Sequence, residues 1–291
     1  MASADEFFKR VNALLDKIDV LLPGTRPLPD LENYRAFRWQ HQGLGRSIIP
    51  VESPSLVKLS DLKCIDRQKI AIERNTRQFI RGLPANHVLL WGPRGTGKSS
   101  LIKALLNEFK NQNLKLIEVE KQHLIDLPDI VQTLGDQKAS FIVFCDDLSF
   151  EADDPSYKAM KVVIDGSIAS TPDNILIYAT SNRRHLMPEY MNENKDSRLI
   201  GTELHLSETI EEKISLSERF GLWLAFHPFS QDEYLSIVDY WLEKLKAPIP
   251  EKEIVHKAAM KWALEHGSRS GRSAHQFAKD WTGRQLLKEE A

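Results

Sequence analysis

GPRGTGKS, residues Gly92–Ser99, is the stretch that decides how the rest of the chain is interpreted. It fits the pattern Gly-x4-Gly-Lys-Ser/Thr, in which glycines let successive backbone N–H groups point at phosphate oxygens. The apolar run Val88–Trp91 precedes it, and a helical pattern over Ser99–Lys110 follows it. Because the motif requires a strand before it and a helix after it, the stretch predicts a loop that binds the phosphates of a nucleoside triphosphate.

The positions of this loop have different expected tasks. Lys98 reaches the terminal phosphates, and the hydroxyl of Ser99 binds magnesium. The helix that begins at about Lys98 adds the positive end of its dipole beneath the anion. We therefore expect ATP and Mg2+ as cofactors. The loop residues expected to hold them are Gly92, Pro93, Arg94, Gly95, Thr96, Gly97, Lys98, Ser99 and Ser100.

Two further strings place polar groups directly after apolar runs. FIVFCDDLSF brings Asp146 and Asp147 to the end of one run, and ILIYATSN ends in Asn182. A carboxylate at the end of a strand beside the loop strand holds magnesium through water, a role that Asp146 fits. Asp147 and Asn182 are expected to orient the attacking water or to contact the γ-phosphate. Because aspartate is one methylene shorter than glutamate, hydrolysis is expected to be slow or to use another group, with Glu151 as a weaker substitute.

Beyond residue 60, short apolar runs alternate with helical segments, which argues for a mostly parallel sheet covered on both faces. The runs expected to form strands are Val88–Trp91, Leu114–Val119, Phe141–Cys145, Ile175–Ala179 and Leu222–Phe226. After Pro228 the strand signals stop, and Ser230 with Glu233 matches a capping box that opens the first of three helices. The predicted fold class is α/β, a P-loop parallel sheet sandwiched by helices with a small C-terminal all-helical lid.

We expect three parts in the chain: an N-terminal helical extension over 1–52, a nucleotide-binding α/β domain over 53–227, and the helical lid over 228–291. Residues 5–22 carry apolar side chains at helical spacing, and a Pro- and Gly-rich passage ends that helix. The helix is expected to dock on the main body, with docking on a partner as the alternative. The polar stretch over 183–218 is expected to be a solvated loop with a short helix, with contact to a client as the alternative.

Composition narrows the class of protein. The chain has 291 residues, 42% of them hydrophobic and 27% charged, with a net charge of −2, so it lacks the overall basic excess of many nucleic-acid-binding proteins. No apolar run approaches the ~18 residues of a membrane span, and the N-terminus lacks a signal-peptide pattern.

Cys64 and Cys145 match no metal or redox spacing, so we expect buried free thiols. The histidines lack a paired spacing, so no structural metal site is expected, and the location is expected to be cytoplasmic.

The order of these motifs resembles that of the AAA+ ATPase superfamily, from about residue 53 to the end. The sequence also looks like the bacterial domain-of-unknown-function 815 family, a group of predicted AAA+ ATPases without a settled cellular role. The strings that carry this resemblance are WGPRGTGKSSLIKALL, FIVFCDDLSFE, ATSNRRHL, SLSERFGLW and GSRSGRSAHQF. The resemblance implies an ATPase that converts ATP to ADP and phosphate, without naming its cellular task. We expect hydrolysis that is slow or stimulated by a partner and that serves to remodel or assemble an unidentified protein.

The resemblance also implies roles for individual residues. Asn182 matches the sensor-1 position, and Arg219 matches the arginine finger that reaches the γ-phosphate of a neighbouring subunit. A homo-oligomer with shared active sites follows from such a finger. Arg272 matches sensor 2 on the lid, with Arg269 as a competitor one turn away. The alternative for Arg219 is a surface ion pair, for example with Glu218.

One departure from the superfamily favours a different class of function. The segment EVEKQHLIDLPDI, from Glu118, lacks the aromatic and glycine residues of a polypeptide-threading loop. The alternative function is therefore a slowly hydrolysing, nucleotide-gated adaptor or loader that binds a protein or DNA partner. DNA binding is not favoured, because Phe277 and Trp281 in the basic tail have the spacing of lid core residues. A small-molecule kinase is also disfavoured, because such enzymes lack the helical tail.

Overall fold

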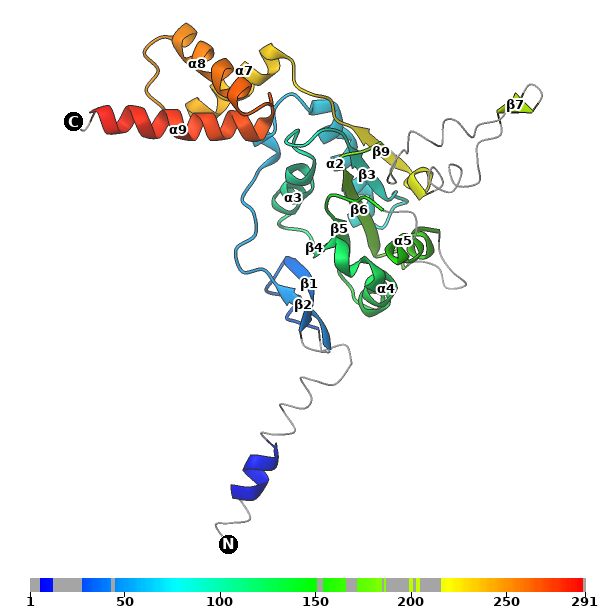
Figure 1. Ribbon diagram of the computed structural model, residues 1–291. Coiled ribbons are helices and arrows are strands. Elements are labelled where there is room, and N and C mark those ends of the chain that lie inside the picture. Colours follow the sequence, from blue (N-terminus) through cyan, green and yellow to red (C-terminus); the bar gives the residue numbers. More distant parts are fainter. Residues whose placement is uncertain are drawn as a thin grey trace.

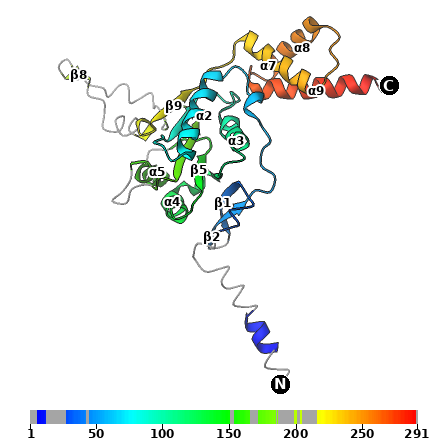
Figure 2. The ribbon, with the colours of Figure 1, turned by 180° about the vertical axis from the view of Figure 1, so that it is seen from behind.

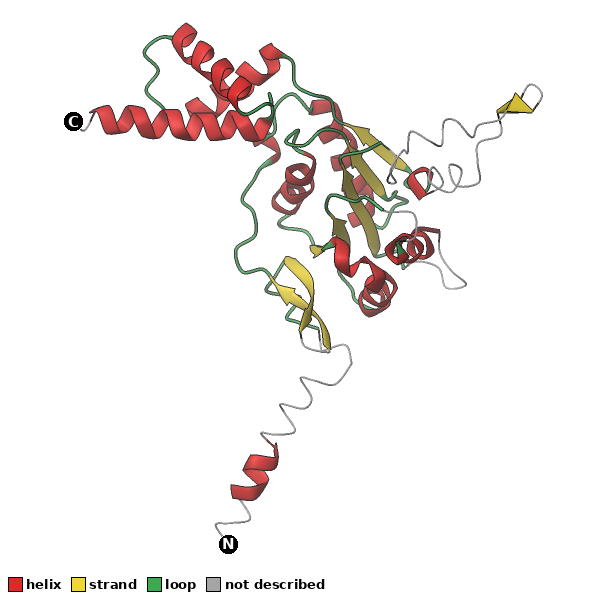
Figure 3. Cartoon of the chain, viewed as in Figure 1, coloured by secondary structure: helices red, strands yellow, loops and turns green. Residues whose placement is uncertain are grey.

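The computed structural model describes residues 6–12, 28–42, 45–150, 154–165, 172–184, 186, 199–200, 203–204 and 216–289. Within these ranges a central sheet is covered by helices, and a group of C-terminal helices lies at one end of it (Figure 1, and Figure 3 by secondary structure). The sheet has seven strands in the order β2-β1-β4-β5-β6-β3-β9. All neighbouring strands are parallel except β1 and β2. The predicted α/β class is therefore confirmed.

The strands of the sheet are β1 (Ala36–Gln42), β2 (Gly45–Pro50), β3 (Val88–Trp91), β4 (Leu114–Val119), β5 (Ser140–Cys145), β6 (Ile175–Ser181) and β9 (Leu222–Ala225). The five strands expected from the apolar runs are all present, within two residues of their expected ends. Two-residue strands β7 (Leu199–Ile200) and β8 (Glu203–Leu204) form a separate hairpin. The central strands β3, β5 and β6 consist largely of buried apolar residues, because helices cover both of their faces.

The strands β1 and β2 correct the expected division of the chain at residue 52. They form an antiparallel hairpin whose first strand pairs in parallel with β4, so residues 36–50 belong to the main sheet. Phe37 and Trp39 are each only 1% exposed, because they pack into the core on one face of the sheet. Phe37 and Trp39 alternate with the polar residues Arg38 and Gln40, which is the period-two pattern of a strand, but we did not use it in interpreting the sequence. Residues 6–12 are helical, and the rest of the expected helix over 5–22 lies outside the described residues.

The helices that cover the sheet are α2 (Asp66–Ile80), α3 (Lys98–Glu108), α4 (Leu127–Gly135) and α5 (Pro155–Asp165), together with the short 3-10 helices η1 (Leu59–Asp61) and η2 (Lys121–Asp126). Alternate residues of each strand separate the interior into two cores. One core joins α2 and α3 to side chains such as Leu90 and Phe144, and the other joins α4 and α5 to Leu89 and Val143. The result is the expected three-layer sandwich, seen from behind in Figure 2.

The C-terminal helices are α7 (Gln231–Lys244), α8 (Lys252–Glu265) and α9 (Gly271–Glu289), and they form the predicted lid. Ser230 and Glu233 make the expected capping box at the start of α7. The core beside α2 and α3 continues into the lid through Phe226 and Phe229, so the lid packs on the sheet domain. Phe277 and Trp281 are buried in this core, in agreement with the interpretation of the aromatic residues in the tail.

The structure also bears on the cysteines, on membrane-spanning helices and on the polar stretch over 183–218. Both cysteines are free, but only Cys145 is fully buried, while Cys64 is half-buried. None of the helices in the described residues combines the length and apolar character needed to cross a membrane. Most of the polar stretch over 183–218, together with Glu151, lies outside the described residues.

Candidate functional site

The loop after β3 has the backbone shape that its glycines predict. Gly92, Gly95 and Gly97 have φ values of +140°, +78° and +101°, which side-chain-bearing residues rarely adopt. Gly92 is further restricted by its surroundings, since a Cβ atom there would lie 2.1 Å from the backbone oxygen of Phe226. The loop therefore curls tightly between β3 and the N-terminus of α3, where the positive end of the helix dipole favours an anion.

Lys98 points back across this loop. Its ammonium group donates to the backbone oxygens of Gly92 and Pro93 at 2.6 and 2.8 Å and to the side-chain oxygen of Asn182 at 3.2 Å. Burial lowers the pKa of Lys98, and the nearby carboxylates of Asp147 and Asp146 oppose that shift. Each of the three N–H groups of the Lys98 ammonium can thus have one acceptor. These hydrogen bonds hold the buried cation in a fixed position at the mouth of the loop.

Asp146 is held by two hydroxyl groups at the end of β5. Ser99 donates to its Oδ1 at 2.6 Å, and Thr180 donates to the same oxygen at 2.5 Å. Thr180 in turn accepts the backbone N–H of Asp147 at 2.9 Å. The predicted magnesium pair, Ser99 and Asp146, therefore meets as expected. Thr180 belongs to β6 and connects it to the two aspartates after β5, a positioning role that we did not assign from the sequence.

Asp147 has an unusual backbone and several partners. Its φ of +53° is uncommon for a residue with a side chain, and such conformations cost about 1–3 kcal/mol. Its carboxylate accepts a hydrogen bond from the Asn182 amide, and Arg94 lies 3.3 Å away as an ion-pair partner. The side chain of Asp147 is 54% exposed, which places the carboxylate at the open side of the site.

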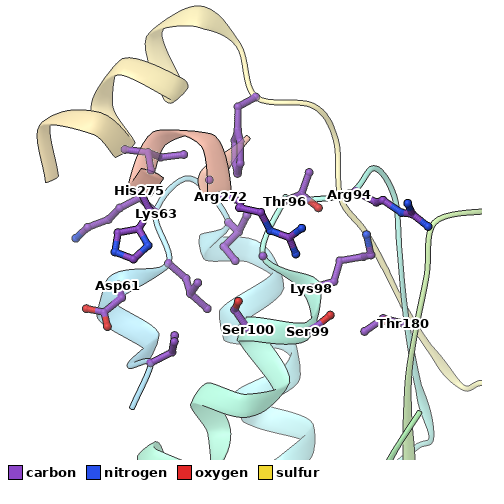
Figure 4. A pocket seen from close by; sticks show the side chains of 18 of the residues that line it. Asp61, Lys63, Arg94, Thr96, Lys98, Ser99, Ser100, Thr180, Arg272 and His275 are labelled. Carbon is purple, nitrogen blue, oxygen red and sulfur yellow. The ribbon is translucent and has the colours of Figure 1, made fainter. Parts of the chain in front are cut away.

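These groups line a cavity of about 510 Å³ between the sheet domain and the lid (Figure 4). One end, which we call the phosphate end, is lined by Arg94–Ser100, Asp146, Asp147, Thr180 and Asn182. The other end, which we call the lid end, is lined by Val57, Asp61–Lys63, Ile65, Phe229, Ile237, Trp241, Gly271, Arg272 and His275. The cavity thus combines a strongly polar end with a mostly apolar one, as ligand sites commonly do.

An aromatic pair forms part of the lid end. The rings of Trp241 from α7 and His275 from α9 have centroids 4.1 Å apart and an angle of 37° between their planes. Burial lowers the pKa of His275, and the cations Lys279 and Lys244 add to that shift. The pair therefore presents a largely uncharged aromatic surface at the lid end, which suits a planar heterocycle.

Asp61 fixes the position of α7 beside this pair. The hydroxyl of Tyr240 donates to the carboxylate of Asp61 at 2.6 Å, and Lys244 makes an ion pair with the same group. Burial acts to raise the pKa of Asp61, but the hydrogen bonds from Lys244 and Tyr240 outweigh it and hold the pKa below its usual value. Because Asp61 belongs to η1, this contact joins the lid to the sheet domain.

The phosphate loop also touches the lid directly. The backbone N–H of Gly271, at the start of α9, donates to the oxygen of Gly95 at 2.9 Å. A Cβ atom on Gly95 would lie 2.7 Å from that of Ser270. Figure 4 shows the Arg272 side chain extending from the lid beside Thr96 and Lys98, whereas Arg269 does not line the cavity. Of the two competing arginines, Arg272 is thus the one in the site.

Arg219 does not line the cavity of its own chain. Its guanidinium makes an ion pair with Asp165 at the end of α5. The alternative for Arg219, a surface ion pair, is therefore present within the chain, with Asp165 as the partner instead of Glu218. The expected role of Arg219 as an arginine finger in a neighbouring subunit therefore remains a proposal.

The residues present fit the expected cofactors. Ser99 and Asp146 offer two adjacent oxygen ligands at the phosphate end, the type that Mg2+ prefers while it keeps several waters. The loop N–H groups, Lys98 and Arg272 offer positive charge for a polyphosphate. The apolar lid end has room for a base. ATP with Mg2+ therefore suits both ends of the cavity.

The parallel sheet, the phosphate loop on β3 and the helical lid define a P-loop ATPase fold of the AAA+ type, and two solved structures share this fold. More particularly, the chain belongs to the family described as "Protein of unknown function (DUF815)", whose profile matches residues 32–285. The family resemblance drawn from the sequence motifs is thereby confirmed. No curated protein matches the chain significantly.

The two solved structures illustrate the likeness in fold. The Thermotoga maritima RuvB Holliday junction branch migration motor aligns with a TM-score of 0.51 and 18% identity, over 77% of this chain and 63% of that chain. The crystal structure of the FIGL-1 AAA domain in complex with ADP aligns with a TM-score of 0.50 and 16% identity, over 78% of this chain and 73% of that chain. The chain thus spans less than two thirds of the RuvB chain, and identities this low show a shared fold alone.

Proposed function

We propose that this protein is an ATPase that binds ATP with Mg2+ in the cavity and hydrolyses it to remodel or assemble a partner protein. The observation that carries the proposal is the Ser99–Asp146 hydrogen bond of 2.6 Å beside the buried Lys98. A hydroxyl, a carboxylate and an ammonium group gathered at one helix N-terminus match the needs of Mg2+ and of terminal phosphates.

The residues around this centre have complementary roles in the proposal. Mg2+, held by Ser99 and through water by Asp146, would neutralise charge on the phosphates. Asp147 and Asn182, which already contact one another, orient the attacking water. Arg272 contacts the phosphates from the lid, so that nucleotide state and lid position are coupled. Catalysis then consists of positioning and charge stabilisation.

Arg219 completes the site from a neighbouring copy of the chain. An arginine finger of this kind contributes about 1,000–100,000-fold to turnover. We therefore expect turnover per subunit to rise with protein concentration, and Arg219→Ala to reduce it by about 1,000-fold or more. Asp165→Asn is the matched control: it breaks the same intrachain ion pair but leaves the arginine in place, so turnover should persist.

Mixed oligomers test the shared site most directly. Asp147→Asn impairs one pocket but keeps its Arg219, whereas Arg219→Ala keeps the pocket but lacks the finger. Neither variant alone should turn over ATP at the wild-type rate, and mixing them should restore part of the activity. Equal specific activity at all protein concentrations, with no recovery on mixing, would contradict the shared site. A lack of Mg2+-dependent phosphate release by the wild type would contradict ATP hydrolysis itself.

The contacts of Asp147 favour a second candidate function, a nucleotide-gated adaptor that hydrolyses ATP slowly. Its carboxylate is short, exposed and engaged by Asn182 and Arg94. Turnover measured with Asp147→Asn discriminates between them: an adaptor should keep ATP-dependent binding of the partner with little change in an already slow turnover, whereas a remodelling ATPase should lose most of its turnover and stall. A pull-down from cells with this variant and ATP would identify the partner and the oligomer together. We propose a protein partner over DNA, and a cytoplasmic site of action.

A further inference from the structure

A cluster of two histidines and one aspartate lies near the edge of the sheet formed by the β1–β2 hairpin, away from the ATP cavity. His41 is near the end of β1, and His123 and Asp126 belong to η2, which follows β4. Because β1 and β4 are parallel neighbours, the end of β1 and the start of η2 meet at the carboxyl edge of the sheet. One potential ligand atom from each of the three side chains lies within 4.8 Å of the others.

The contacts within the cluster are close. His41 Nε2 lies 2.5 Å from Asp126 Oδ2, and the rings of His41 and His123 have centroids 4.1 Å apart. The Nδ1 atom of His123 is buried and has no hydrogen-bond partner among the residues that the structure describes. A buried polar atom without a partner needs an explanation, because almost all such atoms are paired. A simple His41–Asp126 ion pair does not provide one.

We propose that His41, His123 and Asp126 bind a Zn2+ ion that fastens the β1–β2 hairpin to η2. Two imidazoles and one carboxylate suit Zn2+ or a similar transition metal better than Mg2+ or Ca2+, which prefer oxygen ligands. Ligand atoms around one tetrahedral Zn2+ lie roughly 3.3 Å apart, given metal–ligand bonds of about 2.0–2.2 Å. The three side chains therefore need only small shifts, and a water molecule completes the coordination.

The surroundings of the cluster support this site. The side chain of Asp126 is only 1% exposed, and the indole N–H of Trp39 donates to its Oδ2 at 3.0 Å. Donors of this kind orient ligating groups in metal sites. Arg46 lies 3.2 Å from the other oxygen of Asp126 and also pairs with Asp129, so one cation is shared by two carboxylates. With both histidines neutral, as metal ligation requires, the two carboxylates exceed the single arginine by one negative charge, which favours a divalent cation.

This site was not expected from the sequence. His41 and His123 lie 82 positions apart in the chain, and no short spacing joins them. Only the pairing of β1 with β4 brings them together, and that pairing was itself missed. From the sequence we expected no structural metal site. We now propose one, formed by His41, His123 and Asp126.

The test uses the full chain after treatment with a chelator. Calorimetric titration with Zn2+ is expected to give one tight site per chain, and Co2+ should give the visible absorption bands of a site with nitrogen ligands. His123→Gln should weaken Zn2+ binding by about tenfold or more, since even changes outside the ligands cost about 10–100-fold. Because His41 is exposed, His41→Gln provides a second variant with little risk to folding, and the same loss is expected.

His256→Gln is the matched control. His256 also contacts an aspartate, with its Nε2 2.7 Å from Asp239 Oδ1. Within the described residues, however, no third histidine, cysteine or acidic side chain lies close enough to this pair to share a metal ion with it. Zn2+ affinity should therefore be unchanged in this variant. Absence of a one-to-one Zn2+ complex in the wild type, or wild-type affinity in both His41→Gln and His123→Gln, would overturn the proposal.

Discussion

The two ends of the cavity are built in different ways. The phosphate end takes seven consecutive residues, Arg94–Ser100, from the loop after β3 and the first turn of α3, and four more from the ends of β5 and β6. The lid end collects single residues from different segments, such as Leu62 after η1, Trp241 from α7 and His275 from α9. The first end depends on backbone shape and charge, whereas the second depends on how the lid packs. The difference predicts that mutations at the two ends have separable effects on binding.

The largest effect is expected at the phosphate end, from Lys98→Met. Methionine keeps the buried aliphatic stem but removes the cation that contacts Gly92, Pro93 and Asn182. Loss of one preorganised donor typically reduces turnover by about 100–1,000-fold. We expect a loss of this size in phosphate release, and weaker binding of both ATP and inorganic triphosphate in a calorimetric titration.

Lys103→Met is the matched control for this prediction. Lys103 lies on the same helix, but its ammonium group pairs with Glu118 outside the cavity. Turnover should stay within about twofold of the wild type, because a partly exposed ion pair contributes at most about 1 kcal/mol to stability. If Lys98→Met kept wild-type turnover, the phosphate end would not be the catalytic site.

The same contrast explains how much could be predicted from the sequence. The loop, Asp146 and Asn182 follow apolar strands directly, so their positions at one edge of the sheet were expected and found. Arg272 was expected in the lid, and the start of α9 against Gly95 explains why it, and not Arg269, lines the cavity. Short motifs in the sequence were sufficient to predict the positions of these residues.

The remainder depends on contacts between distant segments. Trp241 and His275 have the spacing of ordinary residues in amphipathic helices, and only the packing of α7 on α9 makes them neighbours. The β1–β2 hairpin was missed because its place in the sheet depends on pairing with β4, a distant segment of the chain. The role of Thr180 depends likewise on the adjacency of β5 and β6. No periodicity or short motif reports such pairings.

A smaller and more selective effect is expected at the lid end, from Trp241→Ala. If this ring stacks on the base of ATP, its loss should weaken ATP binding by about tenfold, since stacking contributes about 1–3 kcal/mol per base. Binding of inorganic triphosphate, which has no base, should not change. Competition against a fluorescent ATP analogue would measure both affinities.

Trp241→Phe separates stacking from packing. Phenylalanine keeps an aromatic face, so most of the ATP affinity should remain. Equal losses of ATP and triphosphate binding in Trp241→Ala would mean that the tryptophan supports the lid without contacting the base, and the two ends of the cavity would then not be separable.

The smallest effect concerns the sheet beneath the phosphate end. His87 directly precedes β3, and its Nδ1 accepts the backbone N–H of Ile177 in β6 at 3.0 Å. Burial lowers the pKa of His87 to about 4. Between about pH 6.5 and pH 4 the unfolded chain therefore binds a proton at this residue that the folded chain does not. The resulting loss of stability begins as the pH falls through about 6.5 and is complete below about pH 4.

Between about pH 7 and pH 5.5 this linkage should lower the free energy of unfolding by about 1 kcal/mol. In His87→Asn the side-chain oxygen can still accept from Ile177, but no group titrates in this range. The variant should therefore lose about 1 kcal/mol less than the wild type over the same interval, as measured by urea unfolding at each pH. Parallel losses in the two proteins would show that His87 is protonated in the folded state. The strands that carry the phosphate loop would then not be the acid-sensitive part of the site.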